Sequence, residues 1–337
     1  MGYFGLLVTA GTLLRLAQSH MFMGNPPPFR WREVQDIEEL GMPLNGFPGR
    51  YGQQPFPCKG HHLDIDGPGG IPGATWRAGE LVTIQLFDST NTTGATMNNT
   101  HGTVHSGGSC QIAFSYDKGG TWVVVQSYEG DCPRVREDLK GQVTNLQDAN
   151  QDFTFKVPET FPSGERVIVA WTWINASGHK EYYMSCSSVT IEGAGEPTTV
   201  TPQGPPLLIA NLQADANNAP ENDPLWSKCH SNEETSVVFP QRFGGLNPIV
   251  RAEKVLKFED FPARDDPACA SDNADTLAAL RHGFNTSTTE LEVIQSAAPA
   301  PSPQPSSPSS SRAHHVTAEI GVILLSTAFL CIVGRFV

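Results

Sequence analysis

The stretch Arg166-Val167-Ile168-Val169-Ala170-Trp171-Thr172-Trp173 combines β-branched and aromatic residues in one uninterrupted run. This composition is typical of a β-strand. A second run of the same kind extends from Tyr182 to Ile191. The connection between them, around residues 175–180, is therefore expected at one end of a sheet, where functional sites are commonly built on a rigid scaffold.

Similar strand signals occur earlier in the chain and are separated by turn-rich segments. Asp117-Lys118-Gly119-Gly120 has the composition of a hairpin connection. We find no convincing amphipathic helix pattern among the strand signals. The pattern predicts an all-β fold, a β-sandwich of immunoglobulin-like (fibronectin III-like) type with long loops. The expected strands cover residues 81–87, 110–116, 122–126, 153–157, 166–173 and 182–191.

Beyond Gly195 the strand pattern weakens. Residues 207–212 and 236–239 are candidates for further strands. From Gln241 the chain is expected to be an irregular extension, with a short helix at residues 274–281. No second catalytic domain is expected there.

Composition limits the class of protein and its compartment. The 337 residues carry a formal net charge of −13, which argues against a nucleic-acid partner because such partners usually need a basic patch. Seven cysteines together with an apolar N-terminus indicate the oxidising secretory route. Cysteine spacing alone does not fix their connectivity. Glycosylation sequons of a secreted surface occur at Asn91, Asn98, Asn175 and Asn285.

The N-terminus resembles a signal peptide. Residues 1–19 are mostly apolar and end with the small residues Ala17 and Ser19, the pattern of a signal-peptidase site. Cleavage there makes His20 the first residue, so that its α-amine and its ring Nδ1 can bind one metal ion together. One further imidazole would complete three nitrogens, a donor set that suits Cu(II). The alternative is that His20 follows the signal peptide by chance and binds no metal.

The C-terminus resembles a lipid-anchor signal. A Ser/Pro-rich stretch has the composition of an extended, disordered stalk, and small residues, a polar spacer and a short apolar tail follow. We expect glycosylphosphatidylinositol attachment at Ser309, Ser310 or Ser311. A transmembrane helix is the alternative, but it needs about 20 apolar residues. The expected parts are residues 1–19 (signal peptide), 20–245 (β-sandwich domain), 246–295 (irregular extension), 296–311 (stalk) and 312–337 (removed anchor signal).

Five separated motifs agree in order with one known family: His20-Met21-Phe22-Met23, Cys58-Lys59-Gly60, His105-Ser106-Gly107-Gly108-Ser109-Cys110-Gln111, Trp171-Thr172-Trp173-Ile174-Asn175 and Glu181-Tyr182-Tyr183-Met184-Ser185-Cys186. Over about residues 20–245 the chain resembles the fungal lytic polysaccharide monooxygenases of auxiliary activity family eleven. The resemblance implies an immunoglobulin-like sandwich and a mononuclear copper "histidine brace". It also implies oxidative cleavage of crystalline chitin, with one Cu ion cycling between Cu(II) and Cu(I), an external electron donor, and O2 or H2O2.

The resemblance assigns roles to four residues. His20 would supply the amine and ring nitrogens, His105 the third nitrogen, and Tyr183 the axial position. Glu181 matches an acidic residue near the copper-bound oxygen and could relay a proton. Because side chains alternate along a strand, Glu181 and Tyr183 should share a face that Tyr182 does not. Without the resemblance, Tyr183 could simply be a buried aromatic residue that packs in the core. Glu181 could likewise be an exposed or salt-bridged strand residue.

The same resemblance implies the disulfides Cys58–Cys186 and Cys110–Cys132, which leaves Cys229–Cys269 as a third pair. His179 and Lys180 depart from the polar residues expected at their positions. These differences from the family pattern leave open which polysaccharide is the substrate.

From this resemblance we predict that the protein is a secreted, cell-surface, copper-dependent chitin monooxygenase. It would be a monomer that meets the membrane only through its anchor, at the plasma membrane or cell wall. The rival hypothesis is a non-catalytic, GPI-anchored copper-binding or chitin-binding wall protein. A purely structural wall glycoprotein would require a different cleavage site, one that does not expose His20.

Overall fold

The computed structural model describes residues 21–33, 38–45, 53–89, 104–214, 220–262 and 264–280. Several expectations fall outside these residues, namely those on His20, on the sequons Asn91, Asn98 and Asn285, and on the stalk and anchor signal. Among the described residues, no helix has the length and apolar character needed to cross a membrane.

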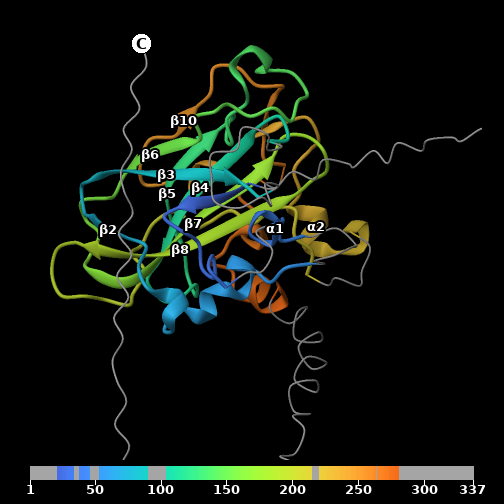
Figure 1. The fold of residues 1–337 in the computed structure, drawn as a ribbon. Helices are drawn as coiled ribbons and strands as arrows, with labels where there is room; N and C mark the ends of the chain where they lie inside the picture. Colours follow the sequence, from blue (N-terminus) through green and yellow to red (C-terminus); the bar gives the residue numbers. More distant parts are fainter. Residues whose placement is uncertain are drawn as a thin grey trace, which may run out of the picture. The chain divides into compact units, whose positions relative to one another are not determined.

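A six-stranded sheet forms the centre of the fold, in the order β10-β5-β4-β7-β8-β2 (Figure 1). Its four inner strands pair antiparallel, and the two edge strands pair parallel with their neighbours. The strands are β2 (Ala74–Arg77), β4 (Gly108–Ser115), β5 (Val123–Glu129), β7 (Gly164–Asn175), β8 (Tyr182–Glu192) and β10 (Val250–Arg251).

A second sheet of three strands has the order β1-β3-β6, and a short parallel pair joins β9 to β11. Their bounds are β1 (Met21–Asn25), β3 (Leu81–Asp88), β6 (Asp152–Lys156), β9 (Ser236–Val238) and β11 (Phe258–Asp260). The two α-helices with determined bounds are α1 (Glu38–Gly41) and α2 (Pro224–Lys228). The 3₁₀ helices are Cys58–Asp64, Pro68–Gly70, Glu137–Leu139, Pro220–Asn222, Gln241–Phe243 and Pro267–Cys269.

All six expected strands are present, so the all-β prediction is confirmed. Residues 236–239 also contain a strand, β9, and residues 274–280 are helical as expected. Residues 207–212 are not a strand, because their amides bond to separate partners. Leu208 forms a single bridge with Ala270, and its N–H donates to the Gln111 side chain.

The six-stranded sheet is covered on both faces. One buried cluster contains Phe155, Trp173 and Tyr183 and includes side chains of β3 and β6 from the smaller sheet. The other contains Tyr182 and Met184 and packs against residues 207–280. The adjacent tyrosines Tyr182 and Tyr183 therefore point to opposite faces, as strand alternation predicted. Because both faces of the central sheet are covered, strands β4 and β5 are buried at every position. Strand β3 of the smaller sheet instead alternates between buried and more exposed residues.

The segment from Pro205 to Leu280, which we call the C-terminal layer, covers the second face of the central sheet through its described residues. Its side chains Phe261, Leu277 and Leu280 are buried in the cluster that contains Tyr182. Strand β10 extends the sheet itself. The part expected to be an irregular extension thus contributes both to the sheet and to the core.

The described residues form three disulfides, Cys58–Cys186, Cys110–Cys132 and Cys229–Cys269. These are the expected pairs. The first fixes the loop before β2 to β8, and the second fixes the start of β4 to the loop that follows β5. The third closes the C-terminal layer on itself.

Candidate metal centre

His105 lies in a turn immediately before β4, with a positive φ of 44°. Two neighbouring loops hold its backbone. The carbonyl of His105 accepts from Ser177 N at 3.0 Å, and the N–H of Ser106 donates to Thr144 O at 2.8 Å. The hydroxyls of Ser106 and Ser177 also bond to each other at 2.7 Å. The position of the imidazole is therefore set by the scaffold.

The ring of His105 lies against the β7–β8 connection. A Cβ atom added to Gly178 would come within 2.6 Å of the His105 Nδ1 atom, so only glycine fits beside the ring. The buried Nε2 atom lies 3.2 Å from Glu181 Oε2, yet it has no hydrogen bond of acceptable geometry among the described residues. Burial, with a smaller effect of His179, lowers the pKa of His105 to about 4. The ring is therefore neutral at pH 7, the form that binds metals.

Tyr183, on β8, lies next to both His105 and Glu181. Its side chain is 1% exposed and stacks on Trp173 with ring centroids 4.3 Å apart. Its hydroxyl donates to Glu181 Oε2 at 2.6 Å. Burial, and then the neighbouring Glu181, raise the pKa of Tyr183 well above its usual value, which keeps the phenol protonated.

Glu181 is 3% exposed and lies one residue before β8. Burial raises its pKa to about 8, although the hydrogen bond from Tyr183 acts in the opposite direction. A carboxyl with this pKa is mostly protonated at pH 7 in the metal-free protein. The structure thus brings together His105, Glu181 and Tyr183, three of the four residues predicted for the site.

Asn175 belongs to this cluster, although the sequence indicated only a glycosylation sequon. The side chain is 3% exposed. Its Nδ2 atom, to which a glycan would attach, donates to Ser177 O, His179 O and Glu181 Oε2. A glycan on Asn175 would have to replace these contacts. One sequence signal did point to a role for Asn175 in the site. This residue ends the motif Trp171-Thr172-Trp173-Ile174-Asn175.

The fourth residue predicted for the site, His20, precedes the first described residue of β1. The next residue, Met21, pairs with Asp88 of β3 and belongs to the same buried cluster as Tyr183. Within the described ranges, no group of three His, Cys, Asp or Glu side chains could hold a metal ion. His20, the predicted partner of His105, lies outside these ranges.

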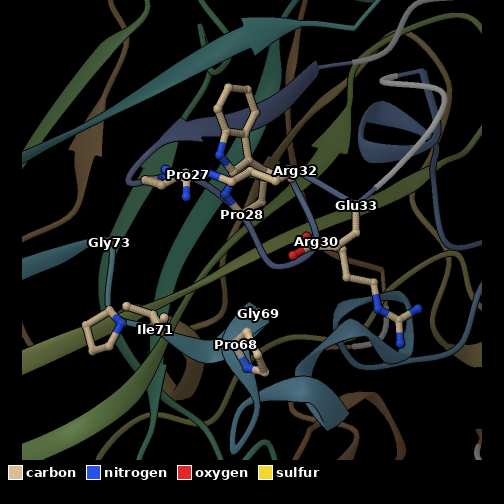
Figure 2. Close-up of a pocket in the computed structure, with 11 residues that line it drawn as sticks. Pro27, Pro28, Arg30, Arg32, Glu33, Pro68, Gly69, Ile71 and Gly73 are labelled. Atoms are coloured by element: carbon tan, nitrogen blue, oxygen red, sulfur yellow. The ribbon is translucent and has the colours of Figure 1, made fainter. Parts of the chain in front are cut away.

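An open pocket of about 160 Å³ lies elsewhere, between residues 27–33 and 68–73 (Figure 2). Its lining is rich in proline and includes Trp31, Arg30 and Arg32. None of His105, Glu181 and Tyr183 lines this pocket, so it is separate from the cluster described above.

Comparison with known proteins identifies the class to which this fold and cluster belong. A scan against family models finds no match. The AA11 family lytic polysaccharide monooxygenase A of Aspergillus fumigatus is 34% identical over 205 residues, covering 58% of this chain and 76% of that protein. The chain therefore belongs to the AA11 family of lytic polysaccharide monooxygenases.

Two further relatives carry the same family name. An Aspergillus oryzae protein is 28% identical over 210 residues, and the B protein of Aspergillus fumigatus is 28% identical over 218 residues. The matches span only 43% and 45% of their lengths. Among solved structures, a family AA15 lytic polysaccharide monooxygenase from Thermobia domestica is 12% identical, covers 51% of this chain and 98% of that chain, and has a TM-score of 0.30.

Proposed function

We propose that this chain is a copper-dependent lytic polysaccharide monooxygenase that cleaves the glycosidic bonds of chitin oxidatively. One structural observation carries the proposal. The buried Nε2 atom of His105 has no hydrogen bond among the described residues, beside a tyrosine and a carboxyl that lie within hydrogen-bond distance of each other. A buried polar atom without a partner calls for an explanation, and in a member of this family a metal ion provides it.

The residues present fit a copper ion. The α-amine and ring of His20 and the Nε2 atom of His105 would hold it, with the hydroxyl of Tyr183 as a further candidate ligand. Nitrogen donors of this kind suit copper, and the low pKa of His105 keeps that ring free of a competing proton. Bound copper would supply the one-electron oxygen chemistry that side chains lack.

The chain's own residues would control protons and water around that ion. Glu181 holds a proton on a carboxyl 3.2 Å from the His105 ring, where it can act as a general acid. Tyr183 keeps its own proton and directs its hydroxyl to that carboxyl. The stacked rings of Trp173 and Tyr183 fill the space beneath the site and keep water out of it.

The setting that we propose is extracellular. Three disulfides among the described residues fit an oxidising compartment. We further propose a signal peptide that ends at Ser19, glycans on Asn91, Asn98 and Asn285, and a lipid anchor on one of Ser309, Ser310 and Ser311. The protein would act as a monomer on crystalline chitin or a related wall polysaccharide.

Electron paramagnetic resonance of Cu(II) tests the proposal. The secreted protein, ending at its natural C-terminus and shown by sequencing to begin at His20, is loaded with one Cu(II) per chain. We expect a nitrogen-rich axial signal that His105→Ala abolishes and that His230→Ala, a change of a half-buried histidine beside α2, leaves unchanged. An identical signal in the His105→Ala variant would contradict the proposal. A normal signal with no product from chitin would instead favour a non-catalytic copper-binding protein.

A further inference from the structure

The main chain of Glu181 lies just outside the β-ladder that would normally fix it. The pairing of β7 with β8 ends at Ile174 and Tyr182, so no strand neighbour takes the N–H and C=O groups of Glu181. Two asparagine side chains do so instead. The Oδ1 atom of Asn175 accepts from Glu181 N at 2.9 Å, and the Nδ2 atom of Asn211 donates to Glu181 O at 2.9 Å.

Asn211 comes from the C-terminal layer and is itself tightly held. Its side chain is fully buried, and its φ of 56° is the left-handed conformation that asparagine tolerates better than most residues. Its N–H donates to Cys229 O at 2.7 Å, and its Oδ1 atom accepts from Ser231 N at 2.9 Å. The amide that reaches Glu181 is therefore fixed by the residues around one half of a disulfide.

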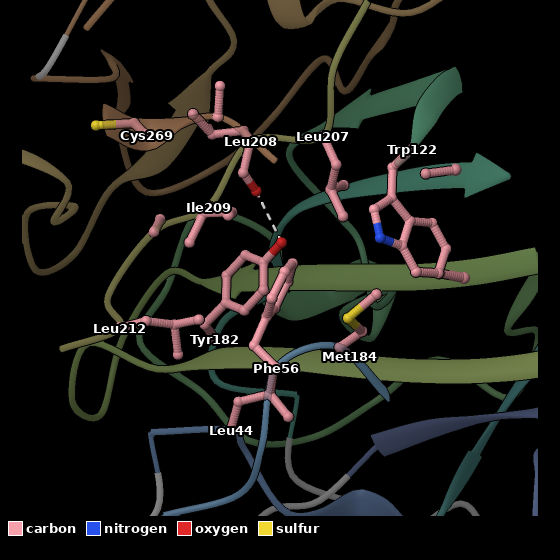
Figure 3. Close-up of a cluster of buried hydrophobic side chains, with 14 of the residues drawn as sticks. Leu44, Phe56, Trp122, Tyr182, Met184, Leu207, Leu208, Ile209, Leu212 and Cys269 are labelled. Carbon is pink, nitrogen blue, oxygen red and sulfur yellow. Dashed lines mark hydrogen bonds between the residues drawn. The ribbon is translucent and has the colours of Figure 1, made fainter. Parts of the chain in front are cut away.

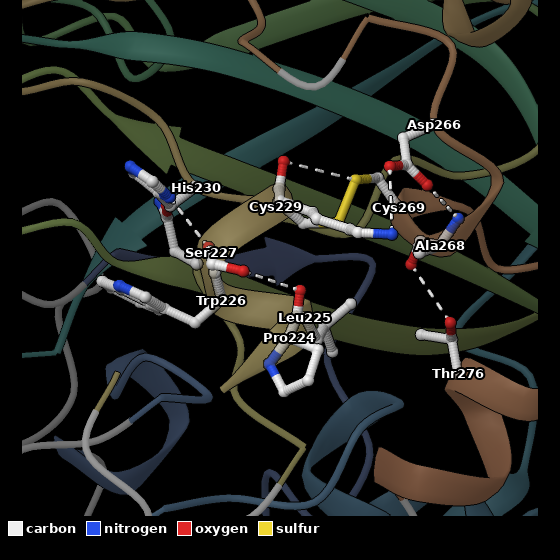
Figure 4. Close-up of a disulfide and its surroundings, with 12 residues drawn as sticks. Pro224, Leu225, Trp226, Ser227, Cys229, His230, Asp266, Ala268, Cys269 and Thr276 are labelled. Atoms are coloured by element: carbon white, nitrogen blue, oxygen red, sulfur yellow. Dashed lines mark hydrogen bonds and ion pairs between the residues drawn. A yellow bond between two sulfur atoms is a disulfide. The ribbon is translucent and has the colours of Figure 1, made fainter. Parts of the chain in front are cut away.

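The disulfide Cys229–Cys269 closes the loop that carries these contacts (Figure 4). The backbone two residues before Asn211 is bonded to the other half-cystine, because Ile209 N donates to Cys269 O at 2.9 Å. Both halves of the disulfide thus support the segment that contains Asn211.

The layer is also fastened directly to the strand that carries Tyr183. The hydroxyl of Tyr182 donates to Leu208 O at 2.7 Å (Figure 3). Tyr182 lies between Glu181 and Tyr183 in the chain but points to the opposite face of the sheet. The C-terminal layer is therefore bonded directly to the residue that lies between Glu181 and Tyr183.

We propose that Asn211 is a positioning residue for Glu181, and that the disulfide-closed C-terminal layer sets the active-site carboxyl through it. Without the amide of Asn211, the buried carbonyl of Glu181 loses its partner, which is unfavourable in a buried site. The peptide between Glu181 and Tyr182 then rotates toward another donor, and the carboxyl leaves the Tyr183 hydroxyl and the His105 ring. The effect on turnover rests on the function proposed above, whereas the positioning itself does not.

Asn211→Gly removes this contact, together with the acceptor for Ser231 N, while glycine accepts the left-handed backbone without strain. Ser231→Ala is its matched control. It removes the hydroxyl that bonds to the Asn211 side chain but keeps both the Ser231 N–H contact and the Asn211 contact to Glu181. Asn211→Asp is the second variant, should the glycine variant not fold. It keeps the acceptor for Ser231 N and, when ionised, lacks the donor to Glu181.

The first readout is the crystal structure of the metal-free variants. We expect the 2.6 Å contact between Tyr183 Oη and Glu181 Oε2 to be lost in Asn211→Gly and kept in Ser231→Ala. The second readout is the Cu(II) resonance spectrum, which should shift only in the Asn211 variant. The third is turnover, which should fall about ten- to a hundredfold, the usual effect of removing a residue that orients groups around a metal.

A double-mutant comparison separates positioning from general damage. In a Glu181→Gln background, Asn211→Gly should cause little further loss of turnover, because the two changes act through one group. An unchanged Glu181 position, or a full independent loss in the Glu181→Gln background, would overturn the proposal. If the unmodified protein gives no oxidised product, the proposed function fails, and the metal-free structures still decide whether Asn211 positions Glu181.

Discussion

The hydroxyl of Tyr183 donates a 2.6 Å hydrogen bond to Oε2 of Glu181, two residues earlier on the same face of the β7–β8 edge. This contact places a protonated carboxyl between a phenol and the imidazole of His105. Burial rather than ionic pairing dominates the electrostatics of all three groups. All three side chains are therefore mostly uncharged at pH 7 in the metal-free protein.

Replacing Glu181 should change how stability depends on pH. Burial raises the pKa of Glu181 from 4.5 to about 8, so between these values the folded protein binds more protons than the unfolded chain. The free energy of unfolding that Glu181 contributes therefore falls as pH rises through this range. We expect metal-free Glu181→Gln to gain stability relative to the unmodified protein from pH 5 to pH 8 in urea titrations. If the free energies of unfolding of the two proteins changed with pH in the same way, burial would not raise the pKa of Glu181.

Gly178→Ala should weaken copper binding. The added Cβ would meet His105 Nδ1 at 2.6 Å, so the ring must move away from its present position. We expect the dissociation constant for Cu(II) to rise by about ten- to a hundredfold in calorimetric titrations. The control is Gly195→Ala, since Gly195 has almost the same φ, +83° against +85°, but no atom within 4 Å of an added Cβ. Equal effects of the two changes would mean that backbone strain, rather than the ring, is responsible.

Lys59 provides a second pH test, away from the metal centre. Its ammonium donates to the backbone carbonyls of Glu39 and Leu40, and burial lowers its pKa from 10.5 to about 7. Between pH 7 and pH 10.5 the unfolded chain binds more protons than the folded protein, so the free energy of unfolding rises with pH. The unmodified protein should therefore gain stability relative to Lys59→Met over this range. A constant difference between the two proteins would contradict the pKa assigned to Lys59.

Removing the C-terminal layer should prevent stable folding of the sandwich. A chain that ends at Gly195 would expose the sheet face carrying Tyr182 and Met184, which the layer covers. An exposed apolar face of this kind leads to aggregation. We expect a chain of residues 20–280 to be soluble with a cooperative thermal transition, and one of residues 20–195 to aggregate or bind hydrophobic dyes. A soluble, cooperatively folding 20–195 chain would show that the layer is dispensable.

The sequence was informative wherever a local pattern decided the structure. Apolar runs predicted β7 and β8, and strand alternation correctly separated Tyr182 from Tyr183. Strand β1 was not among the expected strands; it is only five residues long and ends just before three consecutive prolines.

Contacts between distant residues explain what the sequence did not reveal. The amide of Asn211 meets the carbonyl of Glu181 thirty positions away, and no periodicity marks such a pair. Asn175 matched a glycosylation sequon, and only the folded chain shows its Nδ2 atom enclosed by the β7–β8 connection. Residues 207–212 were predicted as a candidate strand, but a side-chain acceptor and a single bridge, rather than a strand ladder, hold Leu208.

Mass spectrometry of the soluble products is the decisive test of the proposed oxidative cleavage of chitin. Crystalline chitin is incubated with the copper-loaded protein, a reductant, and dioxygen or peroxide. We expect chitin oligosaccharides that carry one additional oxygen atom or a lactone or ketone at a chain end, and we expect these products to be absent with the His105→Ala variant. Unmodified chitin, or oligosaccharides with only hydrolysed ends, from a protein that begins at His20 and holds one copper ion would contradict the proposal.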